Sequence, residues 1–155
     1  MRRLRVFIDT SVFGGCFDEG FDKASIKFFE EVKSGRFSVV VSPRIVLEVN
    51  RARAEVQQVL SGLKGHVEIV RLHDEMTELR NAYLDEGVLG EASADDAEHI
   101  AVASVANVDL LISWNFKHIV HFDKIRAYNA INQLNGYRLI DIRSPQEVAE
   151  YEDDS

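Results

Sequence analysis

Four oxygen-bearing side chains occur at positions where an α/β fold could bring them together: Asp9, Glu48, Asp96 and Asn115. Carboxylates that share one cleft repel each other and raise each other's pKa, so they need a compensating charge. A hard divalent cation such as Mg²⁺ or Mn²⁺ supplies that charge, because it prefers oxygen ligands. These residue types therefore indicate metal-assisted hydrolysis, in which a cation activates water and stabilises charge on a phosphoryl oxygen.

Asp9 follows a short apolar run at residues 6–8 that has no polar alternation. Such a run predicts a strand buried on both faces, as in a parallel sheet. A carboxylate at the carboxyl end of that strand would lie in the crevice where open α/β sheets bind ligands. The alternative role for Asp9 is purely structural, as the cap of the turn that leaves the strand.

Strands and helices are expected to alternate along the chain, which predicts an α/β fold with a mainly parallel sheet of five strands flanked by helices. After the first strand, the other four are expected at 37–41, 67–70, 110–112 and 137–140. Helices are expected at 23–33, 43–60, 94–106, 124–134 and in a short segment after Ser144, and Asp74 is expected to cap a further helix that includes Leu84. Ser42-Pro43 has the form of an N-cap followed by a first-turn proline. Residues 93–96 and 144–147 have the form of capping boxes.

These elements place the other three candidates at one edge of the sheet. Glu48 lies in the early turns of the helix after the second strand, and Asp96 lies in the first turn of an alanine-rich helix. Asn115 follows the fourth strand, close to Asp9 if the first and fourth strands are neighbours. Strand carboxyl ends and the following helix amino ends share one edge of a parallel sheet. The four side chains are therefore expected to face one cleft.

Composition limits the classes of protein that fit. The 155 residues suit one domain over 1–155, with an acidic tail at about 150–155. Cys16 is the single cysteine, which excludes an internal disulfide and favours the cytoplasm. No apolar run is long enough to span a membrane. The net charge of −8 argues against charge-driven nucleic-acid binding by the whole surface, but acidic metal ligands contribute to that charge.

The sequence resembles the PIN-domain family of metal-dependent ribonucleases, particularly the VapC-like toxins of type II toxin–antitoxin pairs. The resemblance rests on Phe-Ile-Asp-Thr-Ser at 7–11, Ser-Pro at 42–43 with Leu-Glu at 47–48, Asp-Asp-Ala-Glu-His-Ile-Ala at 95–101, and Leu-Ile-Ser-Trp-Asn-Phe at 111–116. These motifs lie in family order and cover nearly the whole chain. The resemblance implies a single three-layer PIN-like domain, cleavage of RNA phosphodiester bonds, a homodimer and an antitoxin protein as partner.

By this resemblance, Asp9, Glu48 and Asp96 match the family's acidic metal-binding residues, with Mg²⁺ or Mn²⁺ as cofactor. Asn115 falls where many members have a fourth acid, and an amide supplies no charge, so a single ion is favoured over a pair. Ser113 falls where the family often has a small hydroxyl residue near the site. Asp9 and Asp96 would hold the ion, Glu48 would complete the outer shell or orient the attacking water, and Asn115 would fix a ligand water or the phosphate.

Each candidate has a simpler alternative that the sequence leaves open. Glu48 could pair with Arg44 or Arg51 on a helix surface, Asp96 could belong only to a capping box, and Asn115 could make an Asx-turn. The basic stretch past Asn115 suits either phosphate contact, with Lys117 as the candidate, or a solvated surface. It consists of Lys117, His118, His121, Lys124 and Arg126.

Aromatic and histidine side chains have their own alternatives. His99 is expected to be a hydrogen-bonded core histidine, and Trp114 and Phe116 are expected to pack rather than to stack on bases. Phenylalanines 13, 17 and 21 surround the loop after the first strand and are expected to bury the next helix; if exposed, they would suit a dimer or antitoxin groove.

Two other enzyme classes that begin with a strand ending in an aspartate do not fit. A haloacid-dehalogenase-type phosphotransferase needs a second aspartate at position 11, which is serine, and a receiver domain needs paired acids where Ile8-Asp9 stands. A different functional class remains open, because the amide at Asn115 also suits a catalytically weak or inactive PIN fold. Such a protein would serve as an RNA-binding or protein-binding module.

Overall fold

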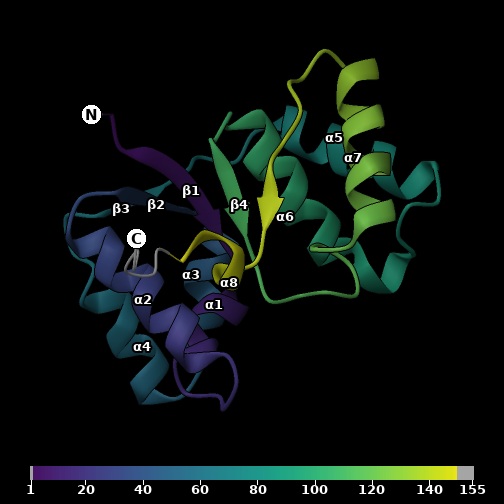
Figure 1. Ribbon diagram of the computed structural model, residues 1–155. Helices are drawn as coiled ribbons and strands as arrows, with labels where there is room; N and C mark the ends of the chain where they lie inside the picture. The colour runs from purple at the N-terminus through teal and green to yellow at the C-terminus, as the bar shows by residue number, and fades with distance from the viewer. Residues whose placement is uncertain (1, 150–155) are drawn as a thin grey trace, which may run out of the picture.

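The computed structural model describes residues 2–149, and the acidic tail expected at about 150–155 lies outside them. Within these residues the centre of the fold is a five-stranded sheet in which every strand pairing is parallel. The strand order is β3-β2-β1-β4-β5 (Figure 1). The strands are β1 (Leu4–Ile8), β2 (Phe37–Val41), β3 (Val67–Ile69), β4 (Leu110–Ile112) and β5 (Ile142–Arg143). The predicted α/β class with a mainly parallel sheet is confirmed.

β1 is the central strand, and its sequence explains its position. Val6, Phe7 and Ile8 have no exposed surface, as expected for an apolar run covered on both faces. In register, Ile8 pairs with Ile112 of β4, while Val6 pairs with Val39 of β2. The predicted neighbourhood of the first and fourth strands is therefore confirmed.

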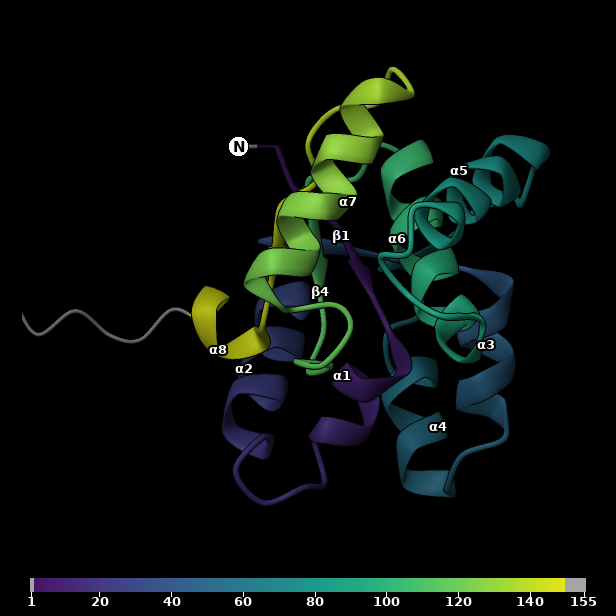
Figure 2. The same ribbon diagram turned by 90° about the vertical axis from the view of Figure 1, so that its right-hand side faces the viewer.

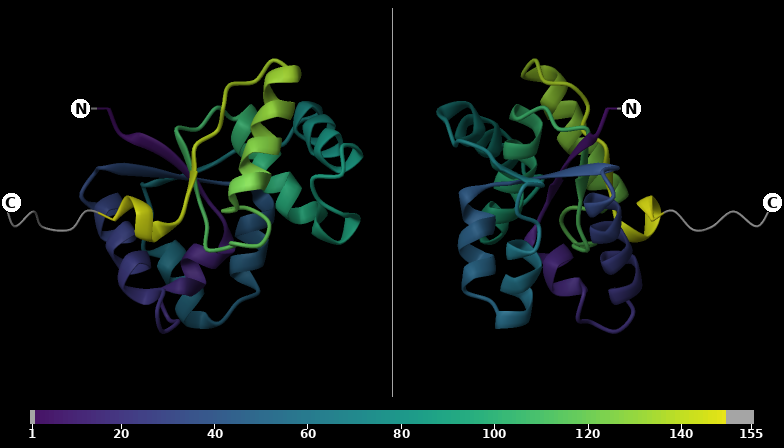
Figure 3. Two further views of the ribbon diagram at one scale, coloured as in Figure 1. Left: turned by 45° about the vertical axis from the view of Figure 1, so that its right-hand side comes forward. Right: turned by 90° about the vertical axis from the view of Figure 1, so that its left-hand side faces the viewer.

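Helices cover both faces of the sheet and give three layers. Figures 1 and 3 show α1–α4 on one side and α5–α7 on the other, while α8 packs beside α2. The helices are α1 (Thr10–Gly15), α2 (Asp22–Lys33), α3 (Pro43–Asn50), α4 (Ala54–Ser61), α5 (Asp74–Asp85), α6 (Ala94–Val105), α7 (Phe122–Leu134) and α8 (Pro145–Val148), with a 3₁₀ turn at Glu91–Ser93. Figure 2 shows β1 leading directly into α1 beside the end of β4. Among the described residues, no helix has the length and apolar character needed to cross a membrane.

The fifth strand is predicted at 137–140 but forms at Ile142–Arg143, so it begins five residues later than the sequence predicts. Residues 137–140 do not join the sheet, because side chains of α7 bind their backbone instead. Asn129 accepts a hydrogen bond from the Ile140 nitrogen at 2.7 Å and donates one to the Ile140 oxygen at 3.1 Å. An asparagine that binds backbone groups in this way competes with the strand ladder. The strand forms at Ile142–Arg143, where the backbone is free to pair with β4.

The single helix expected over 43–60 is wrong, since two helices occupy this segment. Ser42 caps α3 as predicted, with its hydroxyl accepting from the Ile45 nitrogen at 3.2 Å. Arg53 then adopts an extended conformation (φ −57°, ψ 153°) that ends helical geometry. The Gln57 side chain donates to the Ala52 oxygen at 2.7 Å across this break. No glycine or proline marks the break, so the apolar spacing alone could not reveal it.

Two helix starts also differ from the prediction. The Ser93 side chain makes no capping bond to α6; its hydroxyl lies 3.3 Å from Nε2 of His118, because the 3₁₀ turn leads directly into the helix. Asp74 is the first residue of α5 and His73 is its N-cap. The capping box at Ser144 and Glu147 is confirmed, with both reciprocal hydrogen bonds present.

Residues 10–15 form helix α1 where a loop was expected. Of the three phenylalanines in and after this helix, one is buried and two are exposed. Phe13 is fully buried and stacks against Phe29 of α2 at a centroid distance of 5.4 Å, as predicted. Phe17 and Phe21 are exposed, so the expectation that they are buried is wrong.

A buried polar network ties α5, α6 and α7 together on one face of the sheet. The Tyr83 hydroxyl donates to Oδ1 of Asn132, and Nδ2 of Asn132 donates to the Ser104 hydroxyl at 2.9 Å. Tyr83 and Asn132 have no exposed surface, and burial raises the pKa of Tyr83, which keeps its hydroxyl protonated. Since α6 carries Asp96, this network fixes the helix that presents a candidate site residue.

Replacing Asn132 with alanine should lower the free energy of unfolding by about 1–3 kcal/mol, because Tyr83 and Ser104 would lose a buried hydrogen-bond partner. Urea unfolding followed by circular dichroism measures the change. The matched control is Asn81→Ala, since Asn81 is exposed, and it should stay within about 0.5 kcal/mol of the wild type. Equal stabilities for the two variants would contradict the structural role of the network.

Candidate functional site

Asp9 is a buried carboxylate at the carboxyl end of the central strand. Only 6% of its surface is exposed. Its side chain makes no capping bond to α1, which removes the purely structural alternative of a helix cap. Instead, its Oδ1 accepts a hydrogen bond from Ser11 at 2.5 Å and its Oδ2 accepts one from Ser113 at 2.6 Å.

The two serines connect Asp9 to the segment that follows β4. The Ser11 hydroxyl accepts from the Trp114 backbone nitrogen, and the Ser113 hydroxyl accepts from the Asn115 backbone nitrogen, each at 2.9 Å. Each hydroxyl therefore donates to the carboxylate and accepts from the backbone. This arrangement fixes the orientation of the carboxylate between two strand ends.

The surroundings of Asp9 raise its pKa. Burial is the largest cause, because it disfavours the charged form, and the negative charge of Asp96 acts in the same direction. Hydrogen bonds from Ser11 and Ser113, together with the positive potential of His99, act against this rise without cancelling it. A buried acid with a raised pKa beside a second acid is a place where a cation would be stabilised.

Asp96 is half-buried in the first turn of α6 and close enough to Asp9 to affect its pKa. The neighbouring Asp95 is exposed and lies 3.4 Å from the Arg44 guanidinium. This difference agrees with the choice of Asp96 over Asp95 as the site candidate. The capping-box alternative for Asp96 is wrong, since Ser93 makes no cap.

Glu48 is half-buried on α3 and accepts a hydrogen bond from the Thr10 hydroxyl. Thr10 directly follows Asp9, so this bond ties Glu48 to the residue next to the buried acid. Arg44 makes its ion pairs with Glu98 and Asp95 on α6. The Thr10 hydroxyl therefore binds Glu48, and the Arg44 guanidinium also interacts with the charge of Glu48.

Asn115 has the local role that the sequence left as its alternative. Its Oδ1 accepts from the His118 backbone nitrogen at 2.9 Å, and its backbone oxygen accepts from the nitrogens of Ile119 and Val120. Asn115 thus organises the turn after β4. Ser113 is fully buried and donates a hydrogen bond to Asp9, whereas the side chain of Lys117 is exposed.

His99 is buried on α6, with its ring 6.0 Å from that of Phe7. The expectation of a core position is confirmed, but the expected hydrogen bond is missing at one ring nitrogen. Within residues 2–149, Nδ1 of His99 has no hydrogen-bond partner. This histidine acts on the pKa of Asp9 and was not predicted as part of the site.

The residue types present fit a hard cation, since carboxylates from three elements and the serine and threonine hydroxyls are all oxygen donors. The predicted convergence is partial: Asp96 interacts with Asp9, while Glu48 is linked through Thr10. In the described part of the chain, no three Asp, Glu, His or Cys side chains form a group that could hold a metal ion. An ion at Asp9 would compete with the two serine hydroxyls for its oxygens.

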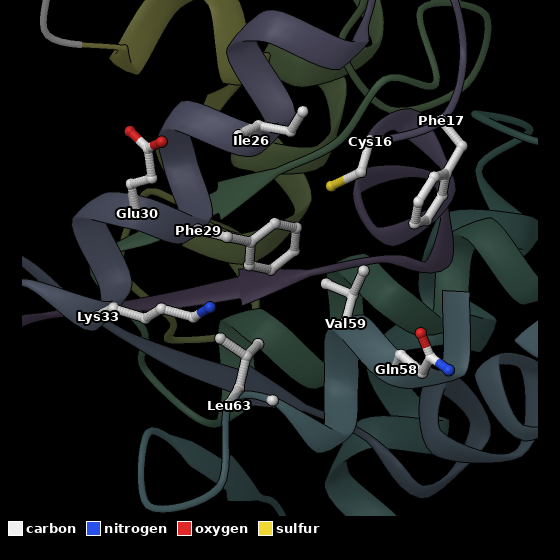
Figure 4. A pocket seen from close by; sticks show the side chains of 10 residues that line it. Cys16, Phe17, Ile26, Phe29, Glu30, Lys33, Gln58, Val59 and Leu63 are labelled. Atoms are coloured by element: carbon white, nitrogen blue, oxygen red, sulfur yellow. The ribbon is translucent and has the colours of Figure 1, made fainter. Parts of the chain in front are cut away.

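A pocket of about 360 Å³ with a mostly apolar lining contains none of the candidate site residues Asp9, Glu48 and Asp96 (Figure 4). Its lining includes Phe17, Ile26 and Phe29 from α1 to α2, and Val59 and Leu63 from α4 and the turn after it. Cys16 also faces this pocket, and burial raises its thiol pKa to about 11. The raised pKa keeps this thiol protonated at neutral pH and disfavours the nucleophilic thiolate form.

Comparison of the chain with models of known families and with curated proteins finds no match.

The raised pKa of Asp9 has a consequence for stability. Since the folded protein holds the proton on Asp9 at higher pH than the unfolded chain does, ionised Asp9 destabilises the fold as pH rises above the ordinary aspartate value. Asp9→Asn should therefore be more stable than the wild type at pH 7 in a chelator, and this advantage should shrink towards pH 4. Thermal melts at the two pH values measure it.

The exposed Asp95→Asn serves as the matched control and should show no such pH-dependent gain. An Asp9→Asn variant that is less stable than the wild type at pH 7 would contradict the assignment of a costly buried charge.

Proposed function

We propose that this chain is a metal-dependent endoribonuclease of the PIN-domain type, with its site at Asp9, Asp96 and Glu48. The observation that carries the proposal is the position of Asp9. Along the chain β1 leads to β2, which lies on one side of it, while β4 lies on its other side. The order of the strands therefore reverses at β1, and its carboxyl end is the topological switch point of the sheet. Ligands bind open parallel sheets in the crevice at this point.

Charge supports the same site. Asp9 is buried, its pKa is raised, and Asp96 adds to that rise. A protein keeps such a costly arrangement most readily where a cation offsets it. Asp9 and Asp96 would hold Mg²⁺ or Mn²⁺, and Glu48 would lie in its outer shell. When bound, the cation supplies Lewis-acid stabilisation of phosphoryl charge and lowers the pKa of water.

The chain's own residues then have distinct tasks in phosphodiester hydrolysis. Ser11 and Ser113 hold the Asp9 carboxylate in one orientation, and Thr10 holds Glu48. Glu48 would accept a proton from the attacking water as the water oxygen bonds to phosphorus. The P–O ester bond then breaks, and the leaving oxygen takes a proton from solvent. Exposed Lys117 meets the phosphate charge, while Asn115 keeps the turn that presents it.

The family resemblance extends the proposal to partners. It implies a cytoplasmic homodimer and an antitoxin protein, and the exposed side chains of Phe17 and Ile26 beside the apolar pocket offer a surface for protein contact. A second candidate function is an inactive PIN fold that binds RNA or protein. It is favoured by the local role of Asn115, which supplies no fourth charge.

Asp9→Asn and Asp96→Asn should each lower Mg²⁺-dependent cleavage of a single-stranded oligoribonucleotide by about 100-fold or more, because each removes charge that stabilises the transition state. Gel analysis of labelled products measures the loss, and circular dichroism checks folding. Asp95→Asn is the matched control and should cleave at the wild-type rate. Unchanged cleavage in either folded site variant would refute the assignment.

Metal binding separates the enzyme from the inactive module. Mg²⁺ or Mn²⁺ added at 100 times its dissociation constant should stabilise the wild type by about 2.7 kcal/mol, because only the folded chain assembles the site. Calorimetric titration gives the dissociation constant and thermal melts give the shift. Asp9→Asn should lose both signals and Asp95→Asn should keep them. A wild type that binds neither ion would favour the inactive module.

A further inference from the structure

The Arg44 side chain links the two helices that carry Glu48 and Asp96. Arg44 lies in the first turn of α3, and its Nε donates a hydrogen bond to the Glu98 carboxylate of α6. Its Nη1 lies 3.4 Å from Asp95, in the first turn of the same helix. Arg44 has 37% of its side chain exposed, and Glu98 has only 15%. We call the hydrogen-bonded ion pair of Arg44 and Glu98 the interhelix bridge.

Each end of the interhelix bridge lies within about one helical turn of a candidate site acid. Glu48 follows Arg44 by four residues on α3, so the two side chains share one helix face. The pKa of Arg44 is raised, first by its hydrogen bond to Glu98 and then by the charges of Glu98, Asp95 and Glu48. Asp96 precedes Glu98 by two residues, about 3 Å along the axis of α6. The bridge therefore joins the element that presents Glu48 to the element that presents Asp96.

The packing of the helices leaves this link largely to Arg44. Among the helices, α3 packs on α1 and α4, whereas α6 packs on α5. The Thr10 hydroxyl ties Glu48 to α1 and makes no connection to α6. Within residues 2–149, the ion pairs that join α3 to α6 both belong to Arg44. The pair with Asp95 is the weaker of the two, because Asp95 has 65% of its side chain exposed to water.

The chemistry of the interhelix bridge suits a rigid spacer. A guanidinium group is planar and presents its donors in a fixed fork, so its orientation is set when it binds a carboxylate. Hydrogen bonds between two charged groups are shorter and stronger than those between neutral groups. Because Glu98 is largely shielded from water, its bond to Arg44 is screened less than an exposed ion pair. The bridge is therefore able to fix the separation of α3 and α6.

The separation of these helices decides how Glu48 can contribute to metal binding. In the part of the chain that the structure describes, no three acids form a group that could hold an ion directly. Glu48 would therefore reach an ion at Asp9 and Asp96 through a water ligand, and Mg²⁺ in proteins usually keeps several such waters. A carboxylate bonds a given water only within a narrow range of distance. Outer partners of metal ligands typically change metal affinity about 10- to 100-fold.

We propose that Arg44 is a positioning residue of the metal site, whose bridge to Glu98 holds α3 against α6 so that Glu48 binds the water shell of the cation. This inference rests on the proposed metal-dependent function and adds two residues that touch neither metal nor substrate. Arg44 acts through Glu48 and takes no part in the bond-breaking step. An effect of its charge alone would have the opposite sign, because a positive guanidinium repels a cation.

The test measures Mn²⁺ binding by the full chain in the absence of RNA. Free Mn²⁺ gives an electron paramagnetic resonance signal that is lost on binding, so a titration yields the dissociation constant. Arg44→Gln removes a positive charge and Glu98→Gln removes a negative charge, yet each should raise the dissociation constant about 10-fold or more. The double variant should bind Mn²⁺ as weakly as either single variant, because each single change already removes the same bridge.

A variant that keeps every charge makes the test independent of net charge. Glu98→Asp has the same charge but is one methylene shorter, so it should also raise the dissociation constant for Mn²⁺. It replaces either glutamine variant that fails to fold, as judged by thermal melts in a chelator. The matched controls are Arg53→Gln and Glu55→Gln, which remove the same two charges from an exposed ion pair at the start of α4. Both controls should bind Mn²⁺ as the wild type does.

The possible results separate failure of this inference from failure of the proposed function. Tighter binding by Arg44→Gln, weaker binding by Glu98→Gln and near-normal binding by the double variant would overturn the positioning role in favour of a charge effect. Unchanged dissociation constants with lower melting temperatures would reduce the interhelix bridge to a stabilising contact and leave the ribonuclease proposal intact. A wild type that binds no Mn²⁺ would refute the metal site itself, and this inference with it.

Discussion

Burial of the Asp9 carboxylate between two serine hydroxyls is the interaction on which the site and much of the fold depend. A carboxylate at this depth loses its hydration, and only well-placed donors can offset that loss. Ser11 donates from the first turn of α1, whereas Ser113 donates from the residue after β4. The pairing of Ile8 with Ile112 places Asp9 opposite Ser113. The register of β1 against β4 therefore also fixes the position of the Asp9 carboxylate.

The same hydroxyls connect Asp9 to the segment after β4. Each serine that donates to Asp9 also accepts from the backbone of residues 114 or 115. A change in the charge or ligation of Asp9 would therefore act first on residues 114–117, which include Trp114, Phe116 and Lys117. Because Trp114 is also bound to Ser25 and packed against Gly15, this segment has little freedom to move as a whole. The segment after β4 and the buried acid are therefore positioned by shared hydrogen bonds.

The sequence was sufficient to predict the strands that are buried on both faces, because β1, β2 and β4 each contain three consecutive buried apolar residues. The sequence placed the fifth strand too early, because the side chain of Asn129 on α7 binds the backbone of Ile140. The positions of Asp9, Glu48 and Asp96 followed from strand and helix ends. Their partners did not, because the serine, threonine and histidine contacts form only when distant elements meet.

The short outer strands of the sheet have a consequence of their own. β3 has three residues and β5 has two, and Ser144 and Pro145 follow β5 at once. An unpaired strand edge can pair with a strand of another chain. Edge strands this short offer few free backbone groups for such pairing, and Pro145 after β5 has no backbone N–H to donate. The buried middle strands, rich in valine and isoleucine, are the most aggregation-prone part of this fold. Because the outer strands β3 and β5 are so short, the sheet offers little free edge for fibril-like growth.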